Sequence, residues 1–160
     1  MAATLNHVSI SAPDIEASAR FYEELFGLER VPAPNFGFPV LWLRAGDLQL
    51  HLFQRDVEPP QRHHFGLTVD DFETVYRKAE QMGAFDDKTM GRRISELPDG
   101  AVQLYLRDPA GNLVEVDFPN AGRIDRSVVK DLPKLEDKFP QSEVNRQATL
   151  FLNTEARARR

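Results

Sequence analysis

Apolar and polar residues alternate along several short stretches of the chain, and this alternation predicts half-buried strands. In residues 5–11, Val8 and Ile10 face one side, whereas His7, Ser9 and Ser11 face the other. The same period of two predicts further strands at about 40–44, 47–54, 64–69, 101–107 and 112–118. We expect each strand to present one apolar face to a core.

Two stretches with helical spacing of apolar residues follow the first and fourth of these strands. The first helix is expected to begin after Asp14, a suitable N-cap, and to end at Gly27. The second covers about 71–82, with Asp70 or Asp71 as its cap and Gly83 at its end. Prolines and glycines in residues 30–40 predict a loop with a broken strand, and residues 84–100 are expected to be irregular.

These elements form an internal repeat. A shift of the sequence by 57 positions places His7 on His64 and matches the charged residues of the two helices. His51, in the last strand of the first copy, corresponds to Glu115 in the last strand of the second. The repeat indicates two related modules, at about 4–56 and 62–118, each with a strand, a helix and two or three strands.

A chain of 160 residues is long enough for one well-packed domain, which the repeat places in residues 1–120. Residues 121–160 fit neither copy, and Pro133 and Pro140 interrupt their weak helical patterns. We expect this segment to be an appendage that packs on the domain or on a partner subunit. Partial disorder is the alternative, because the segment is charged and broken by prolines.

Composition and charge argue against several classes of function. The net charge of −5 gives no basic surface for nucleic acid, and no apolar run is long enough to span a membrane. The first residues lack the regions of a signal peptide, and the absence of cysteine excludes disulfides, thiolate metal sites and cysteine nucleophiles. These features favour a cytoplasmic protein that acts on a small molecule.

The polar faces of the strands carry the side chains that could bind a metal or transfer protons. A curved sheet would gather these side chains in a cavity. His7, His64 and Glu115 form a set of two histidines and one carboxylate, which is typical of Fe(II) oxygenases because it leaves positions open for substrate and dioxygen. His51 is either a fourth ligand or an acid/base beside the metal. His63 is expected to face away from the site, because it adjoins His64 in the strand.

Tyr105 lies one strand before Glu115, which places its phenol near the carboxylate and makes it a second catalytic candidate. Other residues on the polar faces are expected to contact substrate. They are Ser9, Trp42, Gln49, Phe53 and Gln103.

The sequence resembles the vicinal oxygen chelate superfamily, which includes glyoxalase I, extradiol dioxygenases, bleomycin-resistance proteins and fosfomycin-resistance transferases. The resemblance covers residues 5 to about 118. It rests on Asn6-His7-Val8-Ser9-Ile10, the helix that ends Glu24-Leu25-Phe26-Gly27, the run His64-Phe65-Gly66-Leu67-Thr68-Val69-Asp70, and Asp108-Pro109-Ala110-Gly111-Asn112-Leu113-Val114-Glu115. The implied α+β fold has paired βαβββ modules whose curved mixed sheet surrounds a divalent metal, with helices on the outer face.

The resemblance leaves several reactions open. Tyr105, the turn from Asp108 to Gly111, and Glu115 follow part of the extradiol dioxygenase signature, which implies Fe(II) and a catecholic substrate with His51 as the base. The alternatives are a lyase or isomerase of glyoxalase type, a fosfomycin-type thiol transferase and a drug-binding protein without catalysis. Mn(II), Ni(II) and Zn(II) are alternatives to Fe(II). A homodimer is expected.

Overall fold

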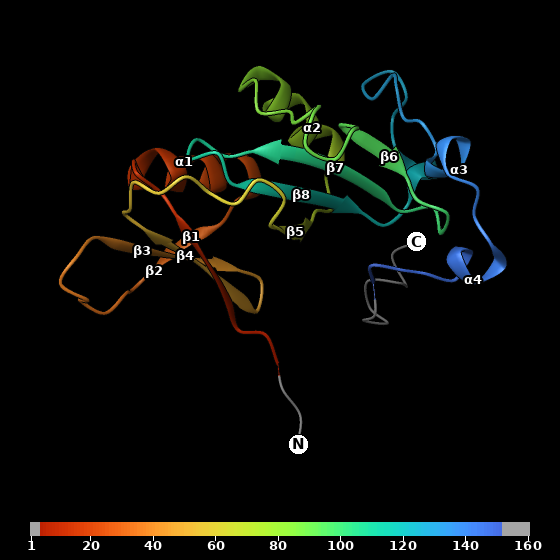
Figure 1. Cartoon of the computed structure of the whole chain (residues 1–160). Coiled ribbons are helices and arrows are strands. Elements are labelled where there is room, and N and C mark those ends of the chain that lie inside the picture. The colour runs from red at the N-terminus through yellow and green to blue at the C-terminus, as the bar shows by residue number, and fades with distance from the viewer. Residues whose placement is uncertain (1–3, 152–160) are drawn as a thin grey trace. The chain divides into compact units, whose positions relative to one another are not determined.

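A computed structural model describes residues 4–151 and has two copies of a βαβββ arrangement (Figure 1). The first copy comprises β1 (His7–Ser11), α1 (Ile15–Phe26), β2 (Glu29–Val31), β3 (Val40–Ala45) and β4 (Leu48–Phe53). The second comprises β5 (His64–Thr68), α2 (Phe72–Gln81), β6 (Ile94–Glu96), β7 (Val102–Arg107) and β8 (Leu113–Phe118). Three short helices follow: η1 (Ala121–Arg123), α3 (Leu135–Lys138) and α4 (Glu143–Arg146). The α+β fold of paired modules predicted from the repeat is confirmed.

Each copy contributes one four-stranded sheet, and the two sheets have equivalent strand orders. The first has the order β1-β4-β3-β2 and the second the order β5-β8-β7-β6. In the first sheet β1 runs parallel to β4, while β3 is antiparallel to both of its neighbours. The second strand of the second copy, β6, lies in the stretch that the sequence predicted to be irregular. It has only three residues, too few for a recognisable alternation.

The described residues divide into two compact units, and the division cuts across the repeat. The first unit contains residues 4–65 together with 107–113, and the second contains residues 66–106 and 114–151. The turn between β7 and β8 therefore packs with the first copy. No helix in the described range is long and apolar enough to cross a membrane.

The register of the first sheet separates a core face from a polar face. Leu50 pairs with Val8 of β1 and Leu43 of β3, and the buried Leu43 and Leu50 lie on the side that packs against α1. His51 pairs with Ser9 of β1 and with Trp42 of β3, so these side chains share the opposite face. The assignment of residues to two faces from their alternation is therefore correct in this sheet.

Both long helices begin and end where the sequence indicated. The Asp14 carboxylate accepts a hydrogen bond from Ala17 N, and Asp71 accepts one from Thr74 N at the start of α2. Gly27 closes α1 with a φ of 66°, a left-handed conformation that costs glycine little. These caps fix the helices relative to the strands that precede them.

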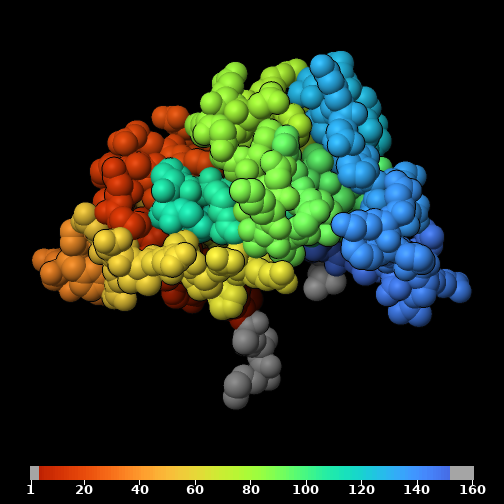
Figure 2. Space-filling model, turned by 45° about the horizontal axis from the view of Figure 1, so that its top comes forward, coloured from red at the N-terminus to blue at the C-terminus, as the bar shows by residue number. Residues whose placement is uncertain are grey.

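Residues after β8 belong to the second unit and pack on its other elements. Glu96 N donates to Pro133 O at 2.9 Å, and Asp125 N donates to the Glu73 carboxylate at 2.7 Å. Ile124, Val129 and Leu132 are buried. In Figure 2 the blue segment lies against the green surface of residues 84–100. Residues 152–160 of the expected appendage lie outside the described residues.

A buried hydrogen bond joins α1 to the turn between β7 and β8. The Tyr22 hydroxyl donates to Asp108 Oδ2 at 2.8 Å, and the same carboxylate accepts bonds from Asn112 Nδ2 and from the backbone of Ala110 and Asn112. Asn112 Nδ2 in turn donates to Ser11 O at 2.9 Å. Burial raises the pKa of Tyr22. The turn is thus held to the first unit by polar contacts at its base.

We expect Tyr22→Phe to lower the free energy of unfolding by about 1–3 kcal/mol, because a buried carboxylate loses one of its donors. Chemical denaturation followed by circular dichroism measures the change. In an Asp108→Ala background the same substitution should cost clearly less, since the acceptor is already gone. An equal cost in both backgrounds would show that the phenol acts through packing rather than through this hydrogen bond.

Candidate active site

Three rings stack on the polar face of the first sheet. The ring centroids of His7 and His51 lie 4.4 Å apart with an interplanar angle of 14°, and those of Trp42 and His51 lie 4.1 Å apart at 5°. The stack follows from the register, because His51 on β4 lies between β1 and β3. His51 is 7% exposed, whereas His7 is open to solvent. The structure therefore brings two of the predicted site histidines together.

A hollow of about 500 Å³ lies on this face. Four of the five residues predicted to contact substrate line it, namely Ser9, Trp42, Gln49 and Phe53. Asn6, Phe36 and the two stacked histidines complete the lining. Among the described residues, the buried Trp42 Nε1 has no hydrogen-bond partner. The hollow therefore presents mainly flat aromatic surfaces.

The hydrogen bonds of the histidine rings separate them into two kinds. His64 Nδ1 lies 2.9 Å from Arg62 O, a carbonyl that can only accept, so Nδ1 carries the proton and Nε2 carries the lone pair. His7 Nδ1 lies 2.5 Å from Asn6 Oδ1, which favours the same tautomer. His51 instead directs Nε2 toward Gln49 Oε1 at 2.8 Å, which leaves the lone pair on Nδ1. His51 thus differs from the two predicted metal-binding histidines.

Burial lowers the pKa of His51, and the nearby His7 lowers it further. Both effects penalise the imidazolium form, since the ring is removed from water and stacked on a second potential cation. His51 is therefore a neutral imidazole at pH 7, with one nitrogen able to accept a proton.

The second unit carries a compact polar cluster around Glu115. Gln103 Nε2 donates to Glu115 Oε1 at 2.7 Å, and Tyr105 and Asp117 also hydrogen-bond to this carboxylate. All four side chains are at least nine-tenths buried. Burial raises the pKa of Tyr105, as do the hydrogen bond and the charge of Glu115. Gln103, predicted to bind substrate, here orients the predicted metal-binding carboxylate.

Asp117 lies beside Glu115 on the same face of β8 and was not predicted from the sequence to be a site residue. Burial raises its pKa to about 8, and the charge and hydrogen bond of Glu115 act in the same direction. Asp117 Oδ1 is buried and has no hydrogen-bond partner among the described residues. The alternation did place Asp117 on the polar face, but alternation carries no information on burial.

Gly66 in β5 makes room for Asp117. A methyl group added at Gly66 would lie 2.7 Å from Asp117 Oδ2, closer than the two atoms can approach. Glycine is unfavourable inside a strand because it packs no side chain and loses more backbone entropy. The close approach of the carboxylate gives a physical reason for glycine at this position.

We expect Gly66→Ala to destabilise the protein by about 1–3 kcal/mol, because the added methyl must displace a buried carboxylate. In an Asp117→Ala background the same substitution should be neutral or stabilising, since alanine is better than glycine in a strand. Denaturant unfolding of the four proteins of this cycle gives the coupling. Equal destabilisation in both backgrounds would refute the steric account.

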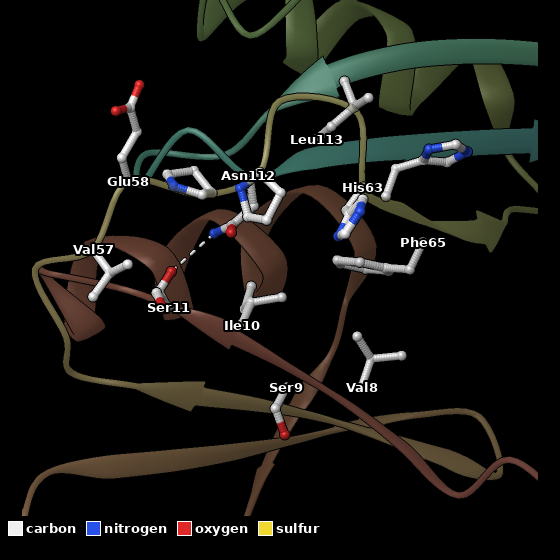
Figure 3. A pocket seen from close by; sticks show the side chains of 13 residues that line it. Val8, Ser9, Ile10, Ser11, Val57, Glu58, His63, Phe65, Asn112 and Leu113 are labelled. Atoms are coloured by element: carbon white, nitrogen blue, oxygen red, sulfur yellow. Dashed lines mark hydrogen bonds between the residues drawn. The ribbon is translucent and has the colours of Figure 1, made fainter.

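A second hollow, of about 240 Å³, lies on the other side of β1 (Figure 3). Val8, Ile10 and Phe65 give it an apolar lining, and Ser9 points away from Val8 and Ile10 as the alternation requires. His63 and His64 both border this hollow, together with residues 57–60 of the linker. Neither histidine lines the aromatic hollow.

No group of three or more histidine, aspartate or glutamate side chains within residues 4–151 is placed to hold a metal ion. The donor chemistry of the predicted ligands nevertheless fits a divalent metal. His7 and His64 have the tautomer that presents Nε2, with Nδ1 hydrogen-bonded to an oxygen as in most metal-binding histidines. The two buried carboxylates Glu115 and Asp117 lie side by side, and Asp117 Oδ1 lacks a hydrogen-bond partner within the same range.

Comparisons with known proteins agree with this architecture. The uncharacterised protein YwbC of Bacillus subtilis is 33% identical over 125 residues, which are 72% of this chain and 97% of that protein. The glutathione transferase FosA of Serratia marcescens is 32% identical over 124 residues, which are 72% of this chain and 81% of that protein. The solved structure of the oxidase ChaP-H2 aligns with a TM-score of 0.60 and 28% identity, covering 76% of this chain and 100% of the other.

A family model described as the Glyoxalase/Bleomycin resistance protein/Dioxygenase superfamily matches residues 4–116. The match covers both βαβββ copies and ends within β8, one residue after Glu115. The resemblance inferred from the sequence is therefore confirmed. The chain belongs to the Glyoxalase/Bleomycin resistance protein/Dioxygenase superfamily, the vicinal oxygen chelate proteins.

Proposed function

We propose that this protein is a divalent-metal-dependent enzyme, and specifically a ring-cleaving dioxygenase that uses Fe(II) and a catecholic substrate. His7, His64 and Glu115 bind the metal. His51 and Tyr105 act on the substrate. The name of the similar oxidase ChaP-H2 supports oxygen chemistry, and members of this superfamily generally use divalent metals.

The main support for this proposal is that His51 has a different tautomer from His7 and His64. His7 and His64 donate through Nδ1, so the Nε2 atom of each presents a lone pair to a metal. His51 donates through Nε2 to Gln49, so its lone pair is on Nδ1. We therefore assign His51 to proton transfer and the other two histidines to metal binding.

Fe(II) held by two imidazoles and one carboxylate would supply open positions for the vicinal oxygens and for dioxygen, and would make a chelated hydroxyl more acidic. His51 takes the second hydroxyl proton at Nδ1, because its lowered pKa keeps the ring neutral at pH 7. Tyr105 remains protonated, since its pKa is raised, and when substrate binds its phenol turns from Glu115 to donate its hydrogen bond to a substrate oxygen. Gln103 orients Glu115 through their 2.7 Å hydrogen bond.

The aromatic hollow supports a flat substrate. Trp42, Phe36 and Phe53 line it beside His51, and planar rings of this kind stack on a substrate ring in offset or edge-to-face geometry. His51 is 7% exposed, because the rings of His7 and Trp42 stack on it. These features favour a catechol over an aliphatic hydroxy acid.

A second candidate is redox-neutral chemistry at the same ligand set, as in a glyoxalase-type lyase or isomerase or in a thiol transferase. The 32% identity with FosA favours it. In this case His51 would move a proton on a carbonyl substrate polarised by Ni(II), Zn(II) or Mn(II). Neither oxygen nor ring cleavage would be involved.

Reconstitution of the metal-free protein separates the two candidates. The protein is loaded anaerobically with Fe(II), Mn(II), Ni(II) or Zn(II), then given catechols in air or a methylglyoxal–thiol hemithioacetal without oxygen. A dioxygenase consumes oxygen and forms a yellow product with Fe(II) or Mn(II) and not with Zn(II), which has no redox chemistry. Isomerisation without oxygen uptake under any metal would replace the first proposal by the second. We also expect a homodimer, which sedimentation analysis measures.

A further inference from the structure

Asp117 is a buried carboxylate to which the proposed mechanism gives no role. It lies two residues after Glu115 in β8, so the two side chains share one face of the strand. Both residues are more than nine-tenths buried, and a hydrogen bond joins their carboxyl groups. β8 therefore presents two carboxylates side by side, whereas the proposed ligand set uses one.

The hydrogen bonds of Asp117 are incomplete when they are compared with those of Asp86, another buried carboxylate of the same unit. Asp86 Oδ1 accepts bonds from the backbone of Lys88 and Thr89, and its Oδ2 accepts one from the Thr89 hydroxyl. Asp117 Oδ1 is buried and has no partner among the described residues. Burial of a carboxylate oxygen without a donor is unfavourable unless a cation takes the place of the donor. The contrast points to a bound cation at Asp117.

Strand β5 determines where this carboxylate lies. Val69 N donates to Asp117 O at 3.0 Å, which fixes the backbone of Asp117 to the strand. The lack of a side chain at Gly66 leaves space for the carboxylate, since a Cβ at that position would lie 2.7 Å from Asp117 Oδ2. Asp117 is therefore held beside Glu115 before any metal binds.

We propose that Asp117 is a further ligand of the divalent metal and binds it together with Glu115. This inference rests on the proposed function, which supplies the metal. Two adjacent carboxylates repel each other when both are ionised, and a divalent cation between them replaces this repulsion by attraction. A metal ion needs no cavity of the size that an organic ligand needs, because its bonds to carboxylate oxygens are only about 2 Å long.

The two carboxylates differ in how firmly they are held. Gln103 and Tyr105 both hydrogen-bond to Glu115, whereas Asp117 Oδ1 has no such partner within the described residues. Glu115 is thus the permanent ligand. Asp117 is the ligand that can leave when a chelating substrate needs its position.

Cysteine substitution with Co(II) as the probe tests whether position 117 contacts the metal. The chain contains no cysteine, so Asp117→Cys introduces a single thiol, whose thiolate is a strong metal ligand. We expect the Co(II)-loaded Asp117→Cys protein to show a thiolate-to-cobalt charge-transfer band in its absorption spectrum. Glu115→Cys is the positive reference. Ser95→Cys is the matched control without a band, because Ser95 is buried on the neighbouring β6, where it pairs with Gln103.

Calorimetric titration of Asp117→Asn with metal gives a second measurement that keeps the shape of the side chain. We expect the affinity for Mn(II) to fall by more than about 100-fold, the upper range for loss of an outer-sphere partner. The affinity for Zn(II) should fall less, because carboxylate oxygens suit Mn(II) better than Zn(II). Asp86→Asn also removes a buried negative charge from the same unit, and it should leave both affinities unchanged.

A band in Glu115→Cys with none in a folded Asp117→Cys overturns the inference and leaves the proposed metal site intact. A band of equal strength in Ser95→Cys also overturns it, because the metal would then be captured by any nearby thiol. If Asp117→Cys does not fold, Asp117→Asn decides, and a loss of Mn(II) affinity below about 100-fold makes Asp117 an outer-sphere partner and rejects the inference. If the native protein binds neither Co(II) nor Mn(II), the proposed function fails together with the inference.

Discussion

Glu115→Ala and His64→Ala should each lose the bound divalent metal while keeping the fold. We expect metal affinity to fall by more than the roughly 10- to 100-fold that follows loss of an outer-sphere partner, because a direct ligand is removed. Metal analysis of protein purified without chelator, with circular dichroism to verify folding, measures the effect. The physical reason is that imidazole Nε2 and carboxylate oxygen atoms supply the donor set itself.

His63→Ala is the matched control for His64→Ala. The two histidines are adjacent in sequence and border the same hollow, but the alternation of side chains along an extended chain points them to opposite faces. His63→Ala should therefore retain stoichiometric metal. Full metal occupancy in the double variant His7→Ala/Glu115→Ala would show that the ligand assignment is wrong.

His51→Ala should reduce turnover by about 100- to 10,000-fold, the usual contribution of a general acid/base, with much less effect on metal content. The burial that lowers the pKa of His51 keeps a neutral base available, and alanine removes its proton-accepting nitrogen. Steady-state oxygen uptake and metal analysis of the same preparation measure the two quantities. Partial rescue by added imidazole would support proton transfer.

Trp42→Phe provides the control for the ring stack. It keeps an aromatic ring against His51 while removing the indole N–H, so turnover should fall far less than in His51→Ala. If His51→Ala loses metal as completely as His64→Ala, His51 is a fourth ligand. The division of roles among the histidines would then have to be abandoned.

Much of the fold could be predicted because its signals are local. Asp14 and Gly27 mark the ends of α1 through capping and a left-handed φ, both properties of single residues. Alternation predicted that His51, Trp42 and Ser9 share a face, and the register of the first sheet brings them together. The three residues of β6 could not be recognised, because its pairing with β7 depends on contacts remote in sequence.

The site was predicted less completely, for identifiable reasons. The Nδ1 partners of His7 and His64 are an adjacent amide and a backbone carbonyl, and the backbone bond depends on the local path of the chain. Gln103 was predicted to contact substrate, and the hydrogen bond from its amide to Glu115 on the neighbouring strand could not be predicted from alternation alone.

The central claim is that His7 and His64 bind the same divalent metal. Pulsed electron paramagnetic resonance of the Mn(II)-loaded protein counts coordinated imidazole nitrogens and tests this claim most directly. The account predicts two imidazoles in the native protein, one in either single histidine-to-alanine variant that retains metal, and two in His51→Ala. A native protein with no imidazole ligand, or a His64→Ala variant that keeps both, would contradict it.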